Sequence, residues 1–173
     1  MYLRIKSFLP VEIKTKLNFH SYMPFDIGFE NENIISEKEE LYCLSMQSGE
    51  ALVEIFLFKK SKLIESIVFK DIGELLIVDD SIPLSNSGIF LTPCLDTGLI
   101  WEELPEEDYH IRIEQEILII KGERDLQFKW GDTVKSFNIN GSIGFSLNKA
   151  NDITAITLYN LQEKEMRNIL SFN

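Results

Sequence analysis

Residues 134–159 read VKSFNINGSIGFSLNKANDITAITLY, and this stretch decides the fold class. Its Asn140-Gly141 dipeptide favours the tight turn of a β-hairpin, because both central residues of a type I′ turn need positive φ angles. Apolar residues alternate with small or polar ones on either side of this turn, as is typical of half-buried strands. Asn151-Asp152 marks a second turn, which precedes an apolar run ending at Tyr159. Three consecutive antiparallel strands are therefore expected here.

The same strand signals extend from this stretch toward the N-terminus. Alternating or apolar runs occupy residues 3–5, 11–19, 41–46, 51–58, 63–69, 75–78, 109–114, 116–121 and 126–130. We interpret the last third of the chain as an antiparallel meander of five or six strands. Residues 20–40 and 79–108 contain prolines and glycines without sustained alternation, and we expect them to be mainly connections.

The C-terminus carries the signature of a helix. Asn160 is a suitable N-cap, with Glu163 three residues later to complete a capping box. Apolar residues then recur near helical spacing, which predicts a short helix over residues 162–170. The chain is therefore expected to be a single domain over residues 1–173. Its predicted fold is mainly β, an antiparallel sandwich or partly closed barrel of about ten strands with one short C-terminal helix.

Charge is concentrated in one part of this chain. The formal net charge is −11, from 17 basic and 28 acidic residues. Residues 71–116 contain 12 acidic residues and one base, Arg112, while the other 16 acids and 16 bases cancel. A concentrated charge creates a local electric field that an even distribution would not create. It also argues against a general nucleic-acid or anionic-membrane binder, because both surfaces are negative.

Residues 96–116 are the strongest candidate for a partner-binding surface. Aromatic anchors bury much area at low entropy cost, and neighbouring carboxylates attract a basic partner during encounter. The candidate residues are Asp96, Trp101, Glu102, Glu103, Glu106, Glu107, Asp108 and Tyr109. The alternative is that Trp101 belongs to the core and the acids form a solvated rim.

Signals for catalysis are weak. His20 and His110 are the only histidines, and each lies in a predicted strand or at its end. The chain has no Gly-x-Ser-x-Gly nucleophile elbow and no phosphate-binding glycine motif. Adjacent glutamates in a proline-containing loop match poorly the paired carboxylates that a glycosidase needs. We therefore expect no enzyme and no catalytic residue.

Metal, cofactor and targeting signals are equally weak. Cys43 and Cys94 lack metal-ligand spacing and are expected to be free thiols. Asp79-Asp80 lacks the ordered pattern of a calcium loop. We expect no metal and no cofactor. Residues 1–6 alternate charge and apolar character instead of forming the apolar core of a secretory signal, so a cytoplasmic location is expected.

A small, acidic, mainly β chain without a catalytic motif resembles the bacterial immunity proteins, which neutralise a cognate toxin. These include the inhibitors of basic nuclease toxins from contact-dependent growth inhibition systems. The resemblance lies in size, charge and absence of catalytic motifs over the whole chain. It implies that acids such as Glu102, Glu103, Glu106, Glu107 and Asp108 cover a basic, nucleic-acid-binding cleft on the toxin. It also implies a basic protein toxin domain as partner, a monomer in the complex, and no direct contact with nucleic acid or membrane.

Two other readings stay open at this point. The 12 phenylalanines could line the cavity of a β-barrel that binds a small ligand. The chain could also be a structural domain that associates with itself, because exposed strand edges can pair. Lys14 and Lys16, on one predicted strand, would oppose such pairing.

Overall fold

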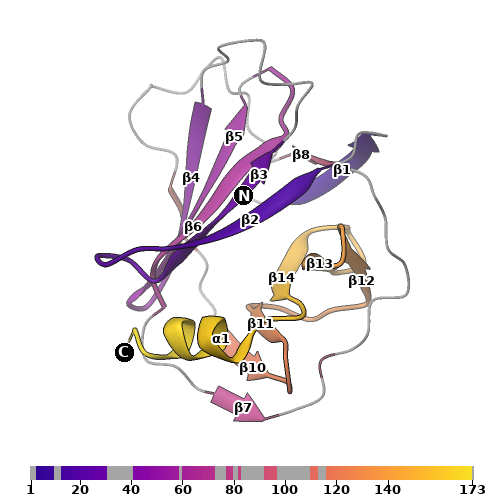
Figure 1. Cartoon of the computed structure of the whole chain (residues 1–173). Coiled ribbons are helices and arrows are strands. Elements are labelled where there is room, and N and C mark those ends of the chain that lie inside the picture. The colour runs from indigo at the N-terminus through magenta and orange to yellow at the C-terminus, as the bar shows by residue number, and fades with distance from the viewer. Residues whose placement is uncertain are drawn as a thin grey trace.

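The computed structural model describes residues 3–9, 13–30, 41–58, 60–72, 77–79, 82, 92–96, 110–112 and 116–172. The chain is mainly β, as the alternating sequence predicts. Two six-stranded sheets pack against each other as a β-sandwich, accompanied by a two-stranded ribbon and a C-terminal helix (Figure 1).

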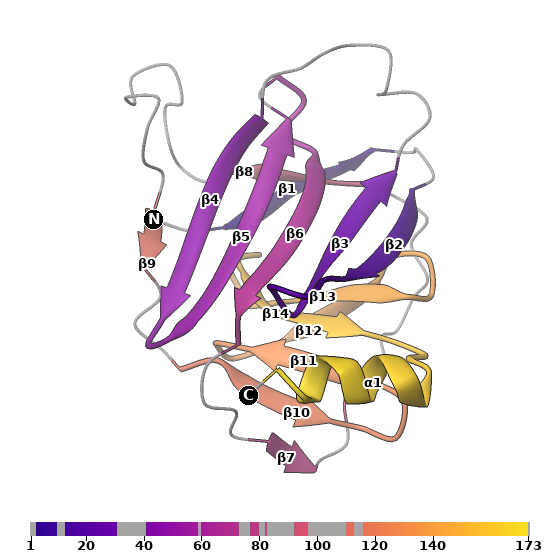
Figure 2. The ribbon, with the colours of Figure 1, turned by 60° about the vertical axis from the view of Figure 1, so that its left-hand side comes forward.

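Sheet 1 contains most of the N-terminal half of the described chain. Its strand order is β2 (Lys14–Phe19), β3 (Phe25–Glu30), β6 (Ile64–Asp71), β5 (Ala51–Phe58), β4 (Leu41–Ser48) and β9 (His110–Arg112). The pairs are antiparallel except for β4 and β9, which run parallel. Figure 2 shows these strands side by side above the second sheet.

Sheet 2 contains the C-terminal part. Its strand order is β12 (Lys135–Asn138), β13 (Ile143–Leu147), β14 (Ile153–Leu158), β11 (Leu126–Lys129), β10 (Leu118–Lys121) and β7 (Ile77–Asp79). The predicted turn at Asn140-Gly141 is confirmed, with φ angles of 98° and 81°. The predicted simple meander is wrong, because β11 pairs with β14 and not with β12. The consecutive strands β12, β13 and β14 lie side by side, and β11, which precedes them in the chain, lies next to β14. This arrangement is a Greek key.

Hydrogen bonds at the end of β11 account for this crossover. The backbone N–H of Trp130 donates to the carbonyl of Thr154 over 2.9 Å. The indole Nε1–H of the same residue donates to the carbonyl of Ile153, also over 2.9 Å. Trp130 is buried, so both bonds form away from water. The chain must therefore cross the sheet after Trp130 to begin β12.

Aromatic rings join the two sheets. Phe25 and Phe69 of sheet 1 are stacked with centroids 4.3 Å apart, and Phe128 of sheet 2 lies 4.6 Å from Phe69. All three side chains are at most 1% exposed. Aromatic pairs at such distances add to the stabilisation that burial alone supplies. These three phenylalanines therefore help to fill the core between the sheets.

The ribbon links the two sheets along one side. It consists of β1 (Arg4–Leu9) and β8 (Thr92–Asp96) in antiparallel pairing. On one side the N–H of Ile5 donates to the carbonyl of Asn151, which precedes β14. On the other side the N–H of Leu95 donates to the carbonyl of Lys62, between β5 and β6. The ribbon therefore bonds to both halves of the sandwich.

The C-terminal helix is confirmed as α1 (Glu163–Leu170). Its cap differs from the prediction, since Gln162 is the N-cap and the Glu165 carboxylate accepts the Gln162 N–H over 2.8 Å. Asn160 instead adopts a φ of 57° in the turn before the helix. Met166 and Ile169 bury the apolar side of α1. Among the described residues, no helix is long and apolar enough to cross a membrane.

The described chain has fourteen strands where about ten were expected. Two of the additional strands lie in regions interpreted as loops. β3 alternates Phe25, Ile27 and Phe29 with polar or small residues, a pattern that the preceding Pro24 obscured. β8 includes Pro93, which lacks an N–H, but a strand of a two-stranded ribbon tolerates proline better than a central strand does.

Candidate functional site

Most of the predicted partner-binding residues lie outside the described part of the chain. Asp96 is the exception, as the last residue of β8, where its backbone is paired with that of Arg4. The predicted residues outside the described ranges are Trp101, Glu102, Glu103, Glu106, Glu107, Asp108 and Tyr109. Whether Trp101 belongs to the core or to an interface therefore stays a prediction.

Both ends of this acidic stretch are attached to the β framework. β8, which precedes it, pairs with β1, and Cys94 donates its thiol to the carbonyl of Ser61 over 3.3 Å. β9, which follows it, extends sheet 1 by pairing in parallel with β4, with His110 opposite Ser45. The 13 residues between β8 and β9 contain five acids and no base. We call residues 97–109 the acidic segment.

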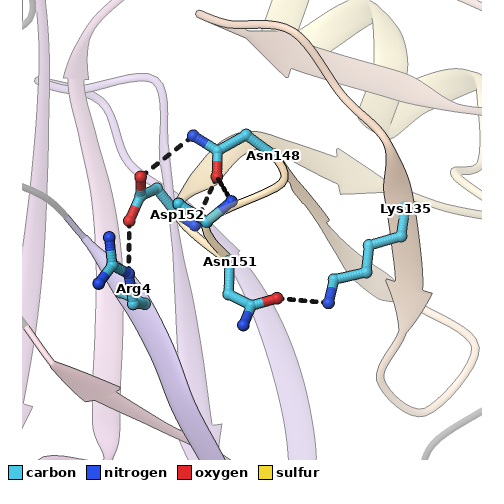
Figure 3. Close-up of polar contacts among 6 residues, drawn as sticks. Arg4, Lys135, Asn148, Asn151 and Asp152 are labelled. Atoms are coloured by element: carbon cyan, nitrogen blue, oxygen red, sulfur yellow. Dashed lines mark hydrogen bonds and ion pairs between the residues drawn. The ribbon is translucent and has the colours of Figure 1, made fainter.

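A polar cluster fixes the ribbon that supports the start of the acidic segment (Figure 3). The guanidinium Nε of Arg4 donates to Asp152 Oδ1 over 2.8 Å, and the Asn148 amide donates to the other carboxylate oxygen over 3.1 Å. The Asn148 side-chain oxygen accepts the N–H groups of Ala150 and Asp152. Lys135 donates to Asn151 in the same turn. The turn before β14 is therefore bonded to β1 through one shared carboxylate.

The described framework is electrically neutral. It contains 15 Asp or Glu residues and 15 Lys or Arg residues, so the entire formal charge of −11 belongs to the rest of the chain. Several framework charges are paired, including Arg4 with Asp152 and Lys70 with Glu54, whose charged atoms lie 2.8 and 2.9 Å apart. The acidic segment carries −5 of the formal net charge of −11.

A second candidate site is a cavity of about 290 Å³ where both sheets meet the start of α1. Its lining includes aliphatic residues from both sheets and from the loop before the helix, most of them buried. These residues are Leu17, Ile27, Ile143, Leu158 and Leu161. The volume is close to the lower end, about 300 Å³, of the range for small-molecule sites.

The rim of this cavity is polar, and hydrogen bonds fix several of its groups. The Asn140 amide donates to Thr15 Oγ1 over 3.0 Å and to the carbonyl of Ile13 over 3.1 Å. The Asn160 amide donates to the carbonyl of Gly141 over 3.0 Å. Asn140 and Asn160 both have positive φ angles, which cost conformational energy in residues other than glycine. Thr15 and Asn160, which line the cavity, are thus each held by a hydrogen bond.

His20 forms a hydrogen-bonded pair with Asp26 at the turn between β2 and β3. The Asn18 amide donates to the other Asp26 oxygen over 2.8 Å, so this carboxylate connects both strands. The exposed ring of Tyr22 lies 5.5 Å from the imidazole. We interpret these hydrogen bonds as stabilising the hairpin formed by β2 and β3. Among the described residues, no group of three or more His, Cys, Asp or Glu could hold a metal ion.

Cys43 lies on β4 beside a buried charge. Burial raises the pKa of its thiol, and the negative charge of Glu54 raises it further. The Ser45 hydroxyl and Lys70 oppose this shift. Glu54 itself is only 9% exposed and is paired with Lys70. A raised pKa disfavours the reactive thiolate, so Cys43 is not activated as a nucleophile.

The cavity is the feature that sequence reasoning missed. Thr15 and Leu17 were interpreted only as strand residues, and Glu165 only as part of a helix. These residues are almost 150 positions apart, and the sequence contains no signal that β2 and α1 meet. The one local signal was Asn140-Gly141, which predicted the turn beside the rim.

Comparison with known proteins provides no family assignment. The chain matches no protein-family model and no curated protein sequence.

Proposed function

We propose that this protein is a non-enzymatic binding protein that neutralises a basic partner, a nuclease-type toxin domain, through an acidic surface over residues 96–116. The observation that carries the proposal is the charge distribution: a neutral framework adjoins a 13-residue segment with five acids and no base. Such a segment attracts a basic partner over distances of about a Debye length. The partner's own catalytic cleft is the natural target, because a nuclease must be basic where it binds nucleic acid.

The framework supports this role by fixing both ends of the segment. The ribbon holds β8 against β1, and the edge of sheet 1 holds β9 against β4. In the proposal, strands that are fixed on both sides of a binding segment lower the entropy lost on binding. In this proposal Trp101 and Tyr109 are the aromatic anchors and the surrounding carboxylates provide electrostatic attraction.

The test is a charge reversal with a matched control. The first variant carries Glu102→Lys, Glu103→Lys, Glu106→Lys and Glu107→Lys. The control carries Glu30→Lys, Glu50→Lys, Glu123→Lys and Asp132→Lys, four exposed acids scattered over the framework. Both variants change the net charge equally. The probe is the basic C-terminal toxin domain expected to be encoded directly upstream in the source genome.

The first variant should lose at least about 100-fold in affinity, because opposing like charges cost several kcal/mol at an interface. The scattered control should lose much less. Equal losses in both variants would show that only net charge matters, and they would contradict the proposed surface. Unchanged affinity in the first variant would contradict it as well.

The cavity favours a second candidate function, the binding of a small ligand. Its lining includes one aromatic residue, Tyr159, so it is not the aromatic-lined cavity that the phenylalanine content suggested. An aromatic-lined cavity elsewhere in the chain stays a prediction. A structure with a ligand bound between the sheets would favour this second function.

A further inference from the structure

The turn between β12 and β13 contains Asn140, the one asparagine in this sequence that a glycine follows. Asn140 is partly exposed and Gly141 is exposed. Among the described residues, no atom beyond its chain neighbours lies within 4 Å of the position that a Cβ of Gly141 would take. The backbone nitrogen of Gly141 is therefore not shielded by a side chain.

The Asn140 side chain also joins the two sheets. Its amide nitrogen donates to the carbonyl of Ile13, just before β2, over 3.1 Å and to Thr15 Oγ1, in β2, over 3.0 Å. Its oxygen accepts the N–H of Ser142 over 3.2 Å. Both amide hydrogens therefore hold the edge strand of sheet 1 against a turn of sheet 2. We call the bonds of Asn140 to Ile13 and Thr15 the amide latch.

An asparagine before a glycine is prone to deamidation, because no Cβ hinders attack by the following backbone nitrogen. The nitrogen of Gly141 forms a bond with Cγ of Asn140, the Cγ–Nδ2 bond breaks, and the amide nitrogen leaves as ammonia with the proton of Gly141. Water then opens the resulting succinimide at either carbonyl, which gives aspartate or isoaspartate. Water is the co-reactant, and no atom is oxidised or reduced.

The folded turn opposes this reaction. The Gly141 N–H donates to Asn138 Oδ1 over 2.7 Å, so the attacking nitrogen is held. The leaving nitrogen of Asn140 is held by the amide latch. Both groups must be released before the ring of the succinimide can close.

We propose that Asn140 is a deamidation site that the amide latch protects, and that it reacts when the turn opens away from β2. The product cannot re-form the latch, because a carboxylate has no hydrogen to donate to the carbonyl of Ile13. Deamidation thus makes a transient opening of this contact between the sheets permanent.

The first experiment follows deamidation of the isolated protein by mass spectrometry of the tryptic peptide 136–149, with fragmentation to locate each site. Asn138 and Asn148 lie in the same peptide and precede bulkier residues, so they are internal controls. In urea, Asn140 should convert at least about tenfold faster than either control. In native buffer its conversion should be at least about tenfold slower than in urea, because the turn must first open. Equal conversion of the three asparagines in urea, or equal rates at Asn140 in both solvents, would overturn the proposal.

Two hydroxyl deletions test the amide latch itself. Thr15→Val removes one acceptor of the Asn140 amide and should speed conversion of Asn140 in native buffer at least about threefold. Thr133→Val is the matched control, because the Thr133 hydroxyl bonds to that of Thr154 and not to the turn, and it should leave the rate unchanged. Equal rates in the two variants would contradict protection by the latch.

The product is tested directly with Asn140→Asp. This variant should melt at least about 2 °C below the wild type, because the carbonyl of Ile13 loses its donor. Asn138→Asp adds the same charge beside the same turn but keeps an oxygen for the Gly141 N–H, so it should melt within about 1 °C of the wild type. Equal melting temperatures of the two variants would show that deamidation does not open the contact. None of these measurements uses the toxin domain, so their outcome is independent of the proposed function.

Discussion

The β framework and the acidic segment use charge in opposite ways. In the framework, 15 acids and 15 bases balance, and pairs such as Arg4 with Asp152 join elements that are distant in sequence. The acidic segment has five acids and no base. Framework charges contribute to the fold, whereas segment charges have no counter-charge along their own stretch. The difference teaches that acids are concentrated without bases in one short segment of the sequence, and that folding and binding should respond to different substitutions.

The largest effect on the framework side is expected from the aromatic core. Phe69→Ala removes a ring that contacts Phe25 in its own sheet and Phe128 in the opposite sheet. The free energy of unfolding should fall by about 3–5 kcal/mol, as measured by urea denaturation. Val134→Ala, at an exposed position, should stay within about 0.5 kcal/mol. Equal effects of the two changes would show that the rings do not join the sheets.

A smaller effect is expected from the polar cluster beside the ribbon. Asp152→Ala removes the acceptor shared by Arg4 and Asn148, so the free energy of unfolding should fall by about 1–3 kcal/mol. Asp132→Ala, which removes an exposed carboxylate, is the matched control. The same small loss of unfolding free energy in both variants would show that the cluster does not stabilise the fold.

The buried thiol should respond to pH in a defined direction. Because the pKa of Cys43 is raised by folding, the unfolded chain releases this proton at lower pH than the folded chain. Its contribution to stability is therefore complete below the unfolded pKa and declines as pH rises through the folded pKa. In a Cys94→Ser background, alkylation at mildly alkaline pH should be several times slower in the folded protein than in urea. Equal alkylation rates in the folded and the unfolded protein would contradict the raised pKa of Cys43.

The smallest effect on folding is expected from the acidic segment itself. Reversing Glu102, Glu103, Glu106 and Glu107 should change the free energy of unfolding by less than about 0.5 kcal/mol, since in the proposed function these acids act on the partner and not on the fold. Urea denaturation of the reversed variant, beside Asp152→Ala, measures this directly. A fall of several kcal/mol in the free energy of unfolding would show that the segment stabilises the fold. It would contradict the distinction between a framework that folds and a segment that binds.

Local patterns in the sequence predicted much of the framework. Period-two alternation located most strands, and Asn140-Gly141 located a turn that both φ angles confirm. The pairing of β11 with β14 was not predictable, because it depends on hydrogen bonds of Trp130 to residues more than 20 positions away. The helix was predicted but its cap was displaced by two residues, since Glu165 reaches back to Gln162 instead.

The two candidate sites, the acidic segment and the cavity, also differ in how far the sequence predicts them. The acidic segment is a property of composition, so the sequence alone identifies it. The cavity depends on the meeting of β2 with the start of α1, and such long-range contacts leave no periodic signal in either segment.

The most direct test of the central claim is the salt dependence of association with the toxin domain. Stopped-flow association rates should be compared for the wild type, the segment reversal and the scattered reversal. The wild-type rate should fall at least about tenfold between about 20 and 500 mM NaCl, because salt screens electrostatic attraction. The scattered reversal should retain most of this dependence and the segment reversal should lose it. A wild-type rate that is insensitive to salt, or equal slopes in both variants, would contradict the account.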